Sequence, residues 1–149
     1  MQLEDIKKNQ LLASNPNFST WVFASAGSGK TRILVNRILR LLLNSTSPEK
    51  ILCLTFTKAG ANEMEERINN DLIKWAKLDD IPLTNSIREI CGNTPSFKEV
   101  IKAQSLILKM FENDLKIKIQ TIHSFCQSLL KIFAFEANIS PNFEVLEDN

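Results

Sequence analysis

One short segment limits the possible folds of this 149-residue chain more than any other: the glycine-rich run Gly27-Ser28-Gly29-Lys30-Thr31. The apolar run Trp21–Ala24 stands two residues before it and predicts a strand. Apolar residues at helical spacing from Arg32 to Leu43 predict a helix directly after it. Glycines between a strand and a helix let backbone N–H groups point inward at the positive end of the helix, an arrangement that binds phosphate. A tight turn without a ligand is the alternative, but G-x-G-K-T runs arise by chance in few chains of this length, so the segment predicts nucleotide binding.

The residue types in this loop have separate chemical tasks. The Lys30 amine is suited to reach the β- and γ-phosphates of a nucleotide, and the Thr31 hydroxyl is suited to hold Mg²⁺. Both residues are therefore candidates for the catalytic centre, and Thr31 is also the candidate metal ligand. The usual pattern is G-x-x-x-x-G-K-[ST], and here Ala24 replaces its first glycine. The nucleotide-binding residues predicted in this segment are Ala26, Gly27, Ser28, Gly29, Lys30, Thr31 and Arg32.

Two further segments predict strands of the same sheet. Ile51–Phe56 is continuously apolar, which suits a parallel strand covered on both faces. Residues 116–122 alternate charged and apolar side chains like a third strand. Helices are predicted between and around these strands, so the fold class is α/β, with a parallel sheet flanked by helices.

The predicted helices differ in how clearly the sequence marks them. The ranges 3–13, 58–75, 97–113 and 124–137 have helical patterns, and Glu63 and Arg67 are spaced for an i,i+4 ion pair in the second. The stretch from Leu78 to Phe97 is weaker, because two prolines and a glycine punctuate it, and it predicts short helical pieces.

Composition excludes several classes of protein. The 18 basic and 17 acidic residues give a net charge of +1, which argues against a free-standing nucleic-acid-binding module. Three widely spaced cysteines and a single histidine have no metal-ligand spacing and predict reduced thiols. The start of the chain lacks the apolar stretch of a signal peptide, and no run approaches the roughly 20 residues that span a bilayer. We expect one soluble, cytoplasmic domain with no membrane partner.

Three segments together resemble the superfamily 1 DNA helicases. They are the loop Ala26-Gly27-Ser28-Gly29-Lys30-Thr31, the motif Ia-like stretch Ile51–Ile68, and Gln120-Thr121-Ile122-His123-Ser124-Phe125-Cys126, which is similar to the T-I-H-S-F-C motif. The spacing Gln10-x-x-Ala13-x-x-Pro16-x-x-Ser19-x-Trp21-Val22 further resembles the start of the AddA helicase–nuclease subunits. Gly60 departs from that resemblance, since the family usually has alanine there.

The resemblance runs from about residue 10 to residue 148 and implies an incomplete P-loop NTPase (RecA-like) fold. Residues 1–149 would form the N-terminal part of a helicase ATP-binding lobe, with a helical insertion at about 77–114. The implied cofactors are ATP and Mg²⁺. The implied partners are single-stranded DNA, the remainder of the helicase and an AddB-like subunit. The complete enzyme would couple ATP hydrolysis to translocation along a strand in double-strand break repair.

The resemblance also implies individual roles. The amide of Gln10 would bind adenine, while the loop residues Lys30 and Thr31 would bind phosphates and Mg²⁺. The residues implied in contacts with single-stranded DNA are Phe56, Thr57, Thr121, His123 and Ser124. Their positions after predicted strands support this role, because ligands gather beyond the carboxyl ends of strands in open α/β sheets. Plain structural roles compete with it: a core position for the phenylalanine, a structural role for the histidine, and a helix N-cap for Ser124.

Parts of a complete motor are missing from the sequence. No apolar strand after Thr31 ends in the Asp-Glu pair that completes a Mg²⁺ site, and there is no second motor lobe. We therefore expect ATP binding with little or no hydrolysis, and exposed apolar surface that favours self-association or a partner fragment. One alternative is a P-loop kinase, which should show an acidic residue where Thr55-Phe56-Thr57-Lys58 stands. The other alternative is a nucleotide-binding remnant without turnover.

Overall fold

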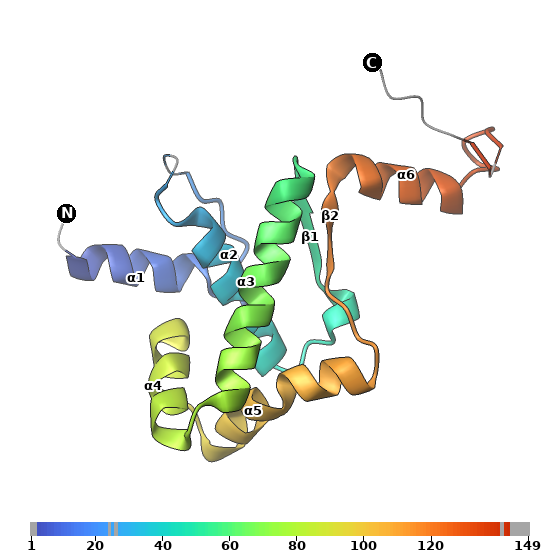
Figure 1. Cartoon of the computed structure of the whole chain (residues 1–149). Coiled ribbons are helices and arrows are strands. Elements are labelled where there is room, and N and C mark those ends of the chain that lie inside the picture. Colours follow the sequence, from blue (N-terminus) through green and yellow to red (C-terminus); the bar gives the residue numbers. More distant parts are fainter. Residues whose placement is uncertain (1–2, 24, 26, 141, 144–149) are drawn as a thin grey trace.

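The computed structural model describes residues 3–23, 25, 27–140 and 142–143. Within these residues, a small parallel sheet lies beside a group of helices (Figure 1). The elements are α1 (Leu3–Ala13), α2 (Lys30–Leu43), the 3-10 helix η1 (Pro48–Lys50), β1 (Leu52–Thr55), α3 (Lys58–Lys77), α4 (Asp80–Cys91), α5 (Phe97–Glu112), β2 (Lys118–Thr121) and α6 (Ile122–Ile132).

The sheet consists of β1 and β2, which run parallel with Leu52 opposite Lys118 and Thr55 opposite Thr121. Three helices connect the two strands, as a parallel pair requires a long crossover. Residues on one face of the sheet, including Cys53 and Ile119, pack against the core. The prediction of an α/β fold with strands at 51–56 and 116–122 is thus confirmed, with each strand shorter than expected. The expectation that the first strand is covered on both faces is wrong, because Leu52 and Leu54 are 44% and 42% exposed.

The strand predicted at Trp21–Ala24 is wrong for its described residues. Residues 21–23 are irregular, with Trp21 and Phe23 92% and 96% exposed, and Ala24 lies outside the described residues. A strand needs the backbone groups of a neighbour, and the two described strands bond to each other instead. The apolar composition of this run was therefore not enough to predict a strand correctly.

The core lies between α2, α3, α4 and α5, with α3 at its centre. Leu39, Leu72 and Leu83 contribute fully buried side chains from three of these helices. The indole Nε1 of Trp75 donates to the Ser86 hydroxyl at 3.1 Å and joins α3 to α4. On the outer face of α3, the predicted Glu63–Arg67 ion pair is present at 2.7 Å.

Helix α5 also holds the C-terminal end of α2. The amine of Lys102 donates to the Leu43 carbonyl oxygen at 2.7 Å and to the Ser45 hydroxyl at 2.6 Å. The last carbonyls of a helix have no partner within it and carry partial negative charge, so a lysine is well placed there. Partial burial lowers the pKa of this lysine.

The stretch after Leu78 is more regular than its composition predicts. Instead of short pieces, α4 is one helix of 12 residues. Pro82 lies in the first turn of this helix, where backbone N–H groups have no hydrogen-bond acceptor within the helix. Proline, which lacks an N–H, therefore costs no helical hydrogen bond there. Gly92 ends the helix at φ +81° and donates its N–H to the Arg88 carbonyl at 2.8 Å, so the glycine acts as a C-cap.

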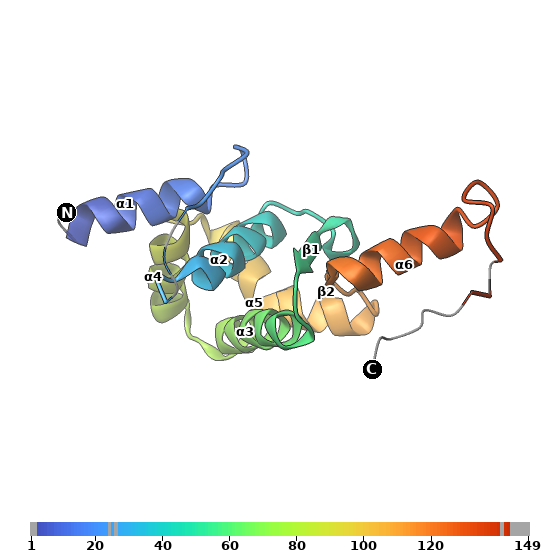
Figure 2. The same ribbon diagram turned by 90° about the horizontal axis from the view of Figure 1, so that it is seen from above.

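Helix α6 extends away from the rest of the described chain in both ribbon views (Figures 1 and 2). None of its residues is buried. It begins at Ile122 and ends at Ile132, whereas the sequence predicted a helix from 124 to 137. Among the described helices, none is long and apolar enough to cross a membrane.

Candidate functional site

The glycine-rich loop forms a tight turn at the start of α2. Gly27 and Gly29 have φ values of +76° and +87°, and Gly29 is the N-cap of the helix. Residues other than glycine rarely adopt this left-handed conformation, so the backbone favours glycine at both positions. The Ser25 carbonyl oxygen accepts from the Ser28 hydroxyl and from the Lys30 amine, each at 2.6 Å. The Lys30 side chain is therefore turned back over the loop.

The other predicted residues of this segment have different surroundings. Thr31 is half-buried in the first turn of α2. The Arg32 guanidinium forms an ion pair with Asp71 of α3 at 2.9 Å, on a side of α2 that faces α3. Ala26, predicted as a nucleotide-binding residue, lies outside the described residues.

Gln10 of α1 lies beside the loop. It lines an open cavity of about 580 Å³ together with Ser28 and with three exposed aromatic residues. Those aromatic residues are Phe18, Trp21 and Phe23. The structure thus brings Gln10 and the loop to one cavity, although Gln10 and Ser28 are 18 positions apart in the sequence.

Two arginines of α2 hold the end of α1, a feature that the sequence analysis missed. Arg40 donates from Nη1 to the Leu11 carbonyl at 2.9 Å and to the Ser14 hydroxyl at 3.0 Å. Arg37 donates to the carbonyls of Asn15 and Phe18 at 2.6 and 2.7 Å. The last turn of α1 has no basic residue of its own, so these cations complement its negative end. The sequence shows arginines at helical spacing on α2, but it does not show that they donate to backbone carbonyls near the end of α1.

The carboxyl ends of β1 and β2 form a second group of predicted residues. Phe56 follows β1 directly and is 82% exposed, so the alternative of a core phenylalanine is wrong. Thr57 is the N-cap of α3, and its hydroxyl accepts from the Gly60 N–H at 3.0 Å. Because Thr55 and Thr121 are paired in register, the residues after the two strands lie side by side.

The residues after β2 repeat this arrangement. Thr121 is the N-cap of α6, and its hydroxyl accepts from the Ser124 N–H at 3.1 Å and lies 2.8 Å from the Ser124 hydroxyl. The cap is therefore Thr121 rather than Ser124. His123 is exposed in the first turn of the helix. Two helix N-termini with hydroxyl caps thus meet at one edge of the sheet.

Gly60 allows the hydroxyls near α3 to come close to the helix. A Cβ atom at this position would lie 2.9 Å from the Thr55 hydroxyl oxygen and 3.0 Å from the Thr57 hydroxyl oxygen. These separations are shorter than ordinary van der Waals contacts. The glycine that departs from the usual family pattern therefore has a local reason in this structure.

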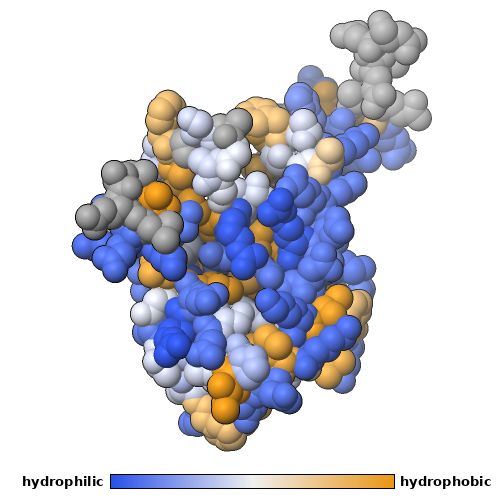
Figure 3. All heavy atoms as spheres, turned by 60° about the vertical axis from the view of Figure 1, so that its left-hand side comes forward, coloured by the Kyte–Doolittle hydropathy of each residue, from blue (hydrophilic) through white to orange (hydrophobic). Residues whose placement is uncertain are grey.

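The loop before α2 and the carboxyl ends of both strands lie at the same end of the molecule, the upper end in Figure 1. Figure 3, which brings the left-hand side of Figure 1 forward, shows hydrophilic residues over much of the middle of the molecule and hydrophobic residues at its upper end. The described residues contain no group of three or more His, Cys, Asp or Glu side chains that would hold a metal ion.

Comparison with known proteins shows which family the chain belongs to. The profile of the UvrD/REP helicase N-terminal domain matches residues 5–149. The chain belongs to this family.

Individual relatives agree with the family. The chain is 32% identical over 127 residues to the A subunit of the ATP-dependent helicase/nuclease of Pediococcus pentosaceus. It is 36% identical over 129 residues to the protein of that name from Clostridium botulinum, and 31% identical over 142 residues to that from Lactobacillus acidophilus. These matches cover 85%, 85% and 95% of the chain but only 9%, 9% and 10% of the relatives. The resemblance to AddA is confirmed, and the chain spans about a tenth of the length of these proteins.

Proposed function

We propose that this chain is the ATP-binding portion of an ATP-dependent DNA helicase, of the helicase–nuclease type that acts in double-strand break repair. The observation that carries the proposal is the placement of the phosphate loop and of both strand ends at one end of the fold. A motor that couples nucleotide hydrolysis to movement along a strand needs these two sites close together.

The nucleotide site follows from the loop geometry. The backbone of residues 27–29 turns at the positive end of a 14-residue helix, which favours an anion. The Lys30 amine would exchange the Ser25 carbonyl for phosphate oxygens, and the Thr31 hydroxyl would hold Mg²⁺. The cavity of about 580 Å³ is within the size range of nucleotide pockets, and the amide of Gln10 would bind adenine there.

The DNA site follows from the strand ends. The exposed ring of Phe56 would stack on a base, which is tolerant of sequence. The Thr57 hydroxyl accepts from a backbone N–H, so its own proton is still available for a phosphate oxygen. Of the Thr121 and Ser124 hydroxyls, one donates its proton to the other, and the second proton is available for a phosphate oxygen. Protonated or neutral, His123 can donate to phosphate from its exposed position.

The piece alone would bind ATP without efficient hydrolysis. The sequence lacks the carboxylate pair that positions the attacking water and the arginines of a second lobe. Turnover and translocation would need the remainder of the helicase. They would also need an AddB-like partner, by analogy with relatives whose names describe them as one of several subunits.

Calorimetric titration of the chain with ATP and Mg²⁺ tests the nucleotide site. We expect binding by the wild type, loss of binding in Lys30→Ala, and no loss in the control Lys77→Ala, which removes a lysine at the far end of α3. ATPase activity should be negligible with or without single-stranded DNA. A folded wild-type chain that does not bind ATP would refute the proposal, and DNA-stimulated turnover would refute the statement that the catalytic half is missing.

Fluorescence anisotropy with a labelled oligothymidine tests the DNA site separately. Phe56→Ala should weaken binding by about 1–3 kcal/mol, the usual contribution of one base–aromatic stack. The control Phe135→Ala removes an equally exposed ring beyond the end of α6 and should leave the affinity unchanged. Equal losses in the two variants would indicate general hydrophobic binding rather than a site at the strand ends.

A further inference from the structure

Helix α5 has more apolar surface than its place in the core explains. One stripe, formed by Val100, Ala103 and Ile107, is buried against the rest of the core. A second stripe is exposed, and Phe97 and Phe111 at its ends are 72% and 75% exposed. A helix at the surface of a globular protein normally needs only one apolar stripe. The second stripe is therefore a candidate contact surface for another helix.

The second stripe has the spacing of a helix–helix seam. Its members follow one another at intervals of four, three, four and three residues, as in a coiled coil. They are Phe97, Ile101, Gln104, Leu108 and Phe111. The four apolar members are exposed, whereas Gln104 is half-buried and its amide donates to the Leu78 carbonyl at 3.2 Å and to the Asp80 carboxylate at 3.3 Å. Hydrophobic atoms are visible at the lower end of the face in Figure 3, at the level where Figure 1 shows α4 and α5.

The order of side chains in this stripe is nearly the same in both directions. A phenylalanine stands at each end, a branched aliphatic residue comes next, and Gln104 is at the centre. A symmetric dimer requires a surface that is complementary to itself when reversed. Two copies of α5 packed antiparallel, with the two-fold axis near Gln104, would meet this requirement.

Charges beside the stripe match the same arrangement. Lys98 and Glu112 are exposed on the same flank, one near each end of α5. In an antiparallel pair the Lys98 end of one copy lies beside the Glu112 end of the other, twice by symmetry. In a parallel pair the two-fold axis would place the same flank of the two copies on opposite sides of the seam, so Lys98 and Glu112 would not meet across it.

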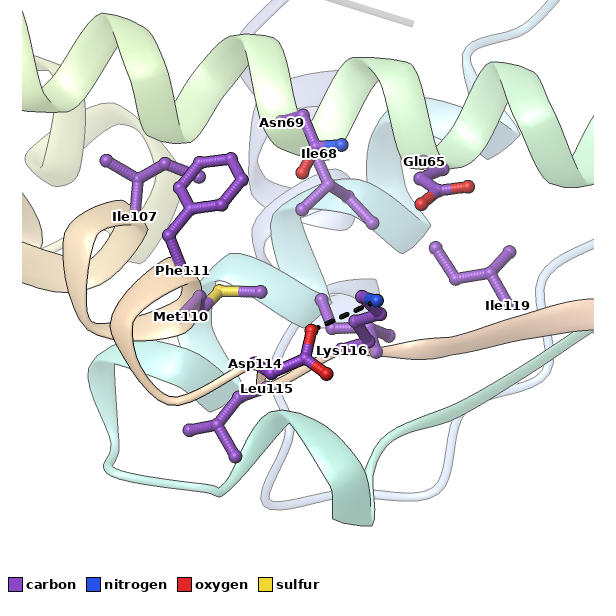
Figure 4. Close-up of a pocket in the computed structure, with 11 residues that line it drawn as sticks. Glu65, Ile68, Asn69, Ile107, Met110, Phe111, Asp114, Leu115, Lys116 and Ile119 are labelled. Carbon is purple, nitrogen blue, oxygen red and sulfur yellow. Dashed lines mark ion pairs between the residues drawn. The ribbon is translucent and has the colours of Figure 1, made fainter.

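A cavity at the end of the stripe fits the ring that an antiparallel partner would bring there. The cavity has a volume of about 140 Å³ and lies between α3, α5 and β2 (Figure 4). Apolar side chains such as Ile68 and Met110 line most of it, and the Asp114–Lys116 ion pair lies at its rim. Phe111 borders both the cavity and the stripe. Cavities of about 150 Å³ accept a benzene ring. The partner's Phe97 is the side chain that an antiparallel pair delivers to this end.

From these features we propose that α5 is a dimerisation helix, which pairs antiparallel with α5 of a second copy of this chain. The stripe forms the seam, and each Phe97 ring approaches the cavity beside Phe111 of the other copy. One helix of 16 residues is a small interface, so the dimer belongs to the weak, micromolar class. This surface is separate from the loop and from the strand ends, and the proposal does not depend on ATP or DNA binding.

Sedimentation of the 149-residue chain over a concentration series tests the proposal. The wild type should dimerise, and Leu108→Glu and Phe97→Ala should each raise the dissociation constant at least tenfold. The control Ile132→Glu places the same charge on an exposed apolar position of α6 and should leave dimerisation unchanged. Circular dichroism of each variant confirms that its helices are intact, since all three positions are exposed.

Mixing two charge variants tests the antiparallel arrangement. Lys98→Glu and Glu112→Lys should each weaken the homodimer, because like charges then meet at both ends of the seam. An equimolar mixture should form the heterodimer, in which opposite charges meet at both ends, with an affinity close to that of the wild type.

Three results would overturn the proposal. The first is a wild-type chain that stays monomeric up to about 0.5 mM, as expected if a different protein covers the stripe. The second is a dimer that Leu108→Glu does not weaken, which would place the contact elsewhere, for example on α6. The third is a mixture of the charge variants that associates no better than each variant alone.

Discussion

Replacing Arg40 with methionine should release the C-terminal end of α1. The guanidinium donates to the Leu11 carbonyl and to the Ser14 hydroxyl, and Ser14 is 1% exposed. An 11-residue helix is too short to be stable in isolation, so α1 depends on such contacts with α2. Methionine retains most of the apolar stem of arginine, which limits the effect to the lost hydrogen bonds.

The size of the effect follows from these two bonds. A hydrogen bond from a charged donor contributes about 1.5–3 kcal/mol. The Ser14 hydroxyl keeps its own bond to the Leu11 carbonyl at 3.2 Å, so neither acceptor loses every partner. Arg40 is also only half-buried, and water replaces part of what is lost. We therefore expect a loss of about 2 kcal/mol, a large share of the roughly 5–15 kcal/mol that stabilise an ordinary domain.

Urea denaturation and hydrogen exchange measure this loss globally and at α1. Amides of α1 should exchange about 30-fold faster in Arg40→Met, since 2 kcal/mol corresponds to that factor. The control Arg67→Met removes an exposed i,i+4 ion pair with Glu63 and should cost only about 0.3–0.5 kcal/mol. A change below about 0.5 kcal/mol in Arg40→Met would refute the argument that these bonds hold α1.

Three further predictions concern separate parts of the chain. With Trp75→Phe, Trp21 is the only tryptophan left, and its fluorescence should change on addition of Mg-ATP because it lines the cavity beside the loop; an unchanged spectrum at saturating ATP would contradict the assigned cavity. The Ser96 N–H and hydroxyl hold the pKa of Glu99 below its ordinary value of 4.5, so the capping box contributes stability above that pH and loses it as the pH falls through the lower folded-state pKa. The difference in melting temperature between wild type and Glu99→Gln should accordingly shrink below about pH 4.5, and a difference that is constant with pH would exclude this account. Cys126 is exposed and should react first with a thiol reagent, ahead of the two half-buried cysteines whose pKa burial raises, as mass spectrometry of the labelled peptides would show.

The sequence predicted the elements that have strong periodicity of their own. The helical spacing of residues 58–75 and the apolar run 51–56 correspond to α3 and β1. The first pattern repeats with the helical period, and the second is a short run of strand-forming residues, so local composition was enough to locate both elements. The glycine loop could also be predicted locally, because a positive φ is a backbone conformation that glycine adopts readily and other residues rarely do.

Features that depend on distant partners could not be predicted in this way. The run Trp21–Ala24 has strand composition, but pairing depends on which edge is available, and composition does not record that. Pro82 was interpreted as a break, whereas its place in the first turn of α4 makes it harmless. The contacts of Arg37 and Arg40 with the end of α1 join residues 19 to 29 positions apart, through carbonyls that every residue possesses.

The bond between Lys102 and the end of α2 has a consequence for protein engineering. The helix that begins with the phosphate loop is anchored at its other end by a side chain 59 residues after Leu43. Deleting the segment around α5 as if it were a removable module would uncover the last carbonyls of α2 and part of its apolar face. A shortened version of this domain should therefore keep the helix that carries Lys102 whole, together with its N-cap Ser96.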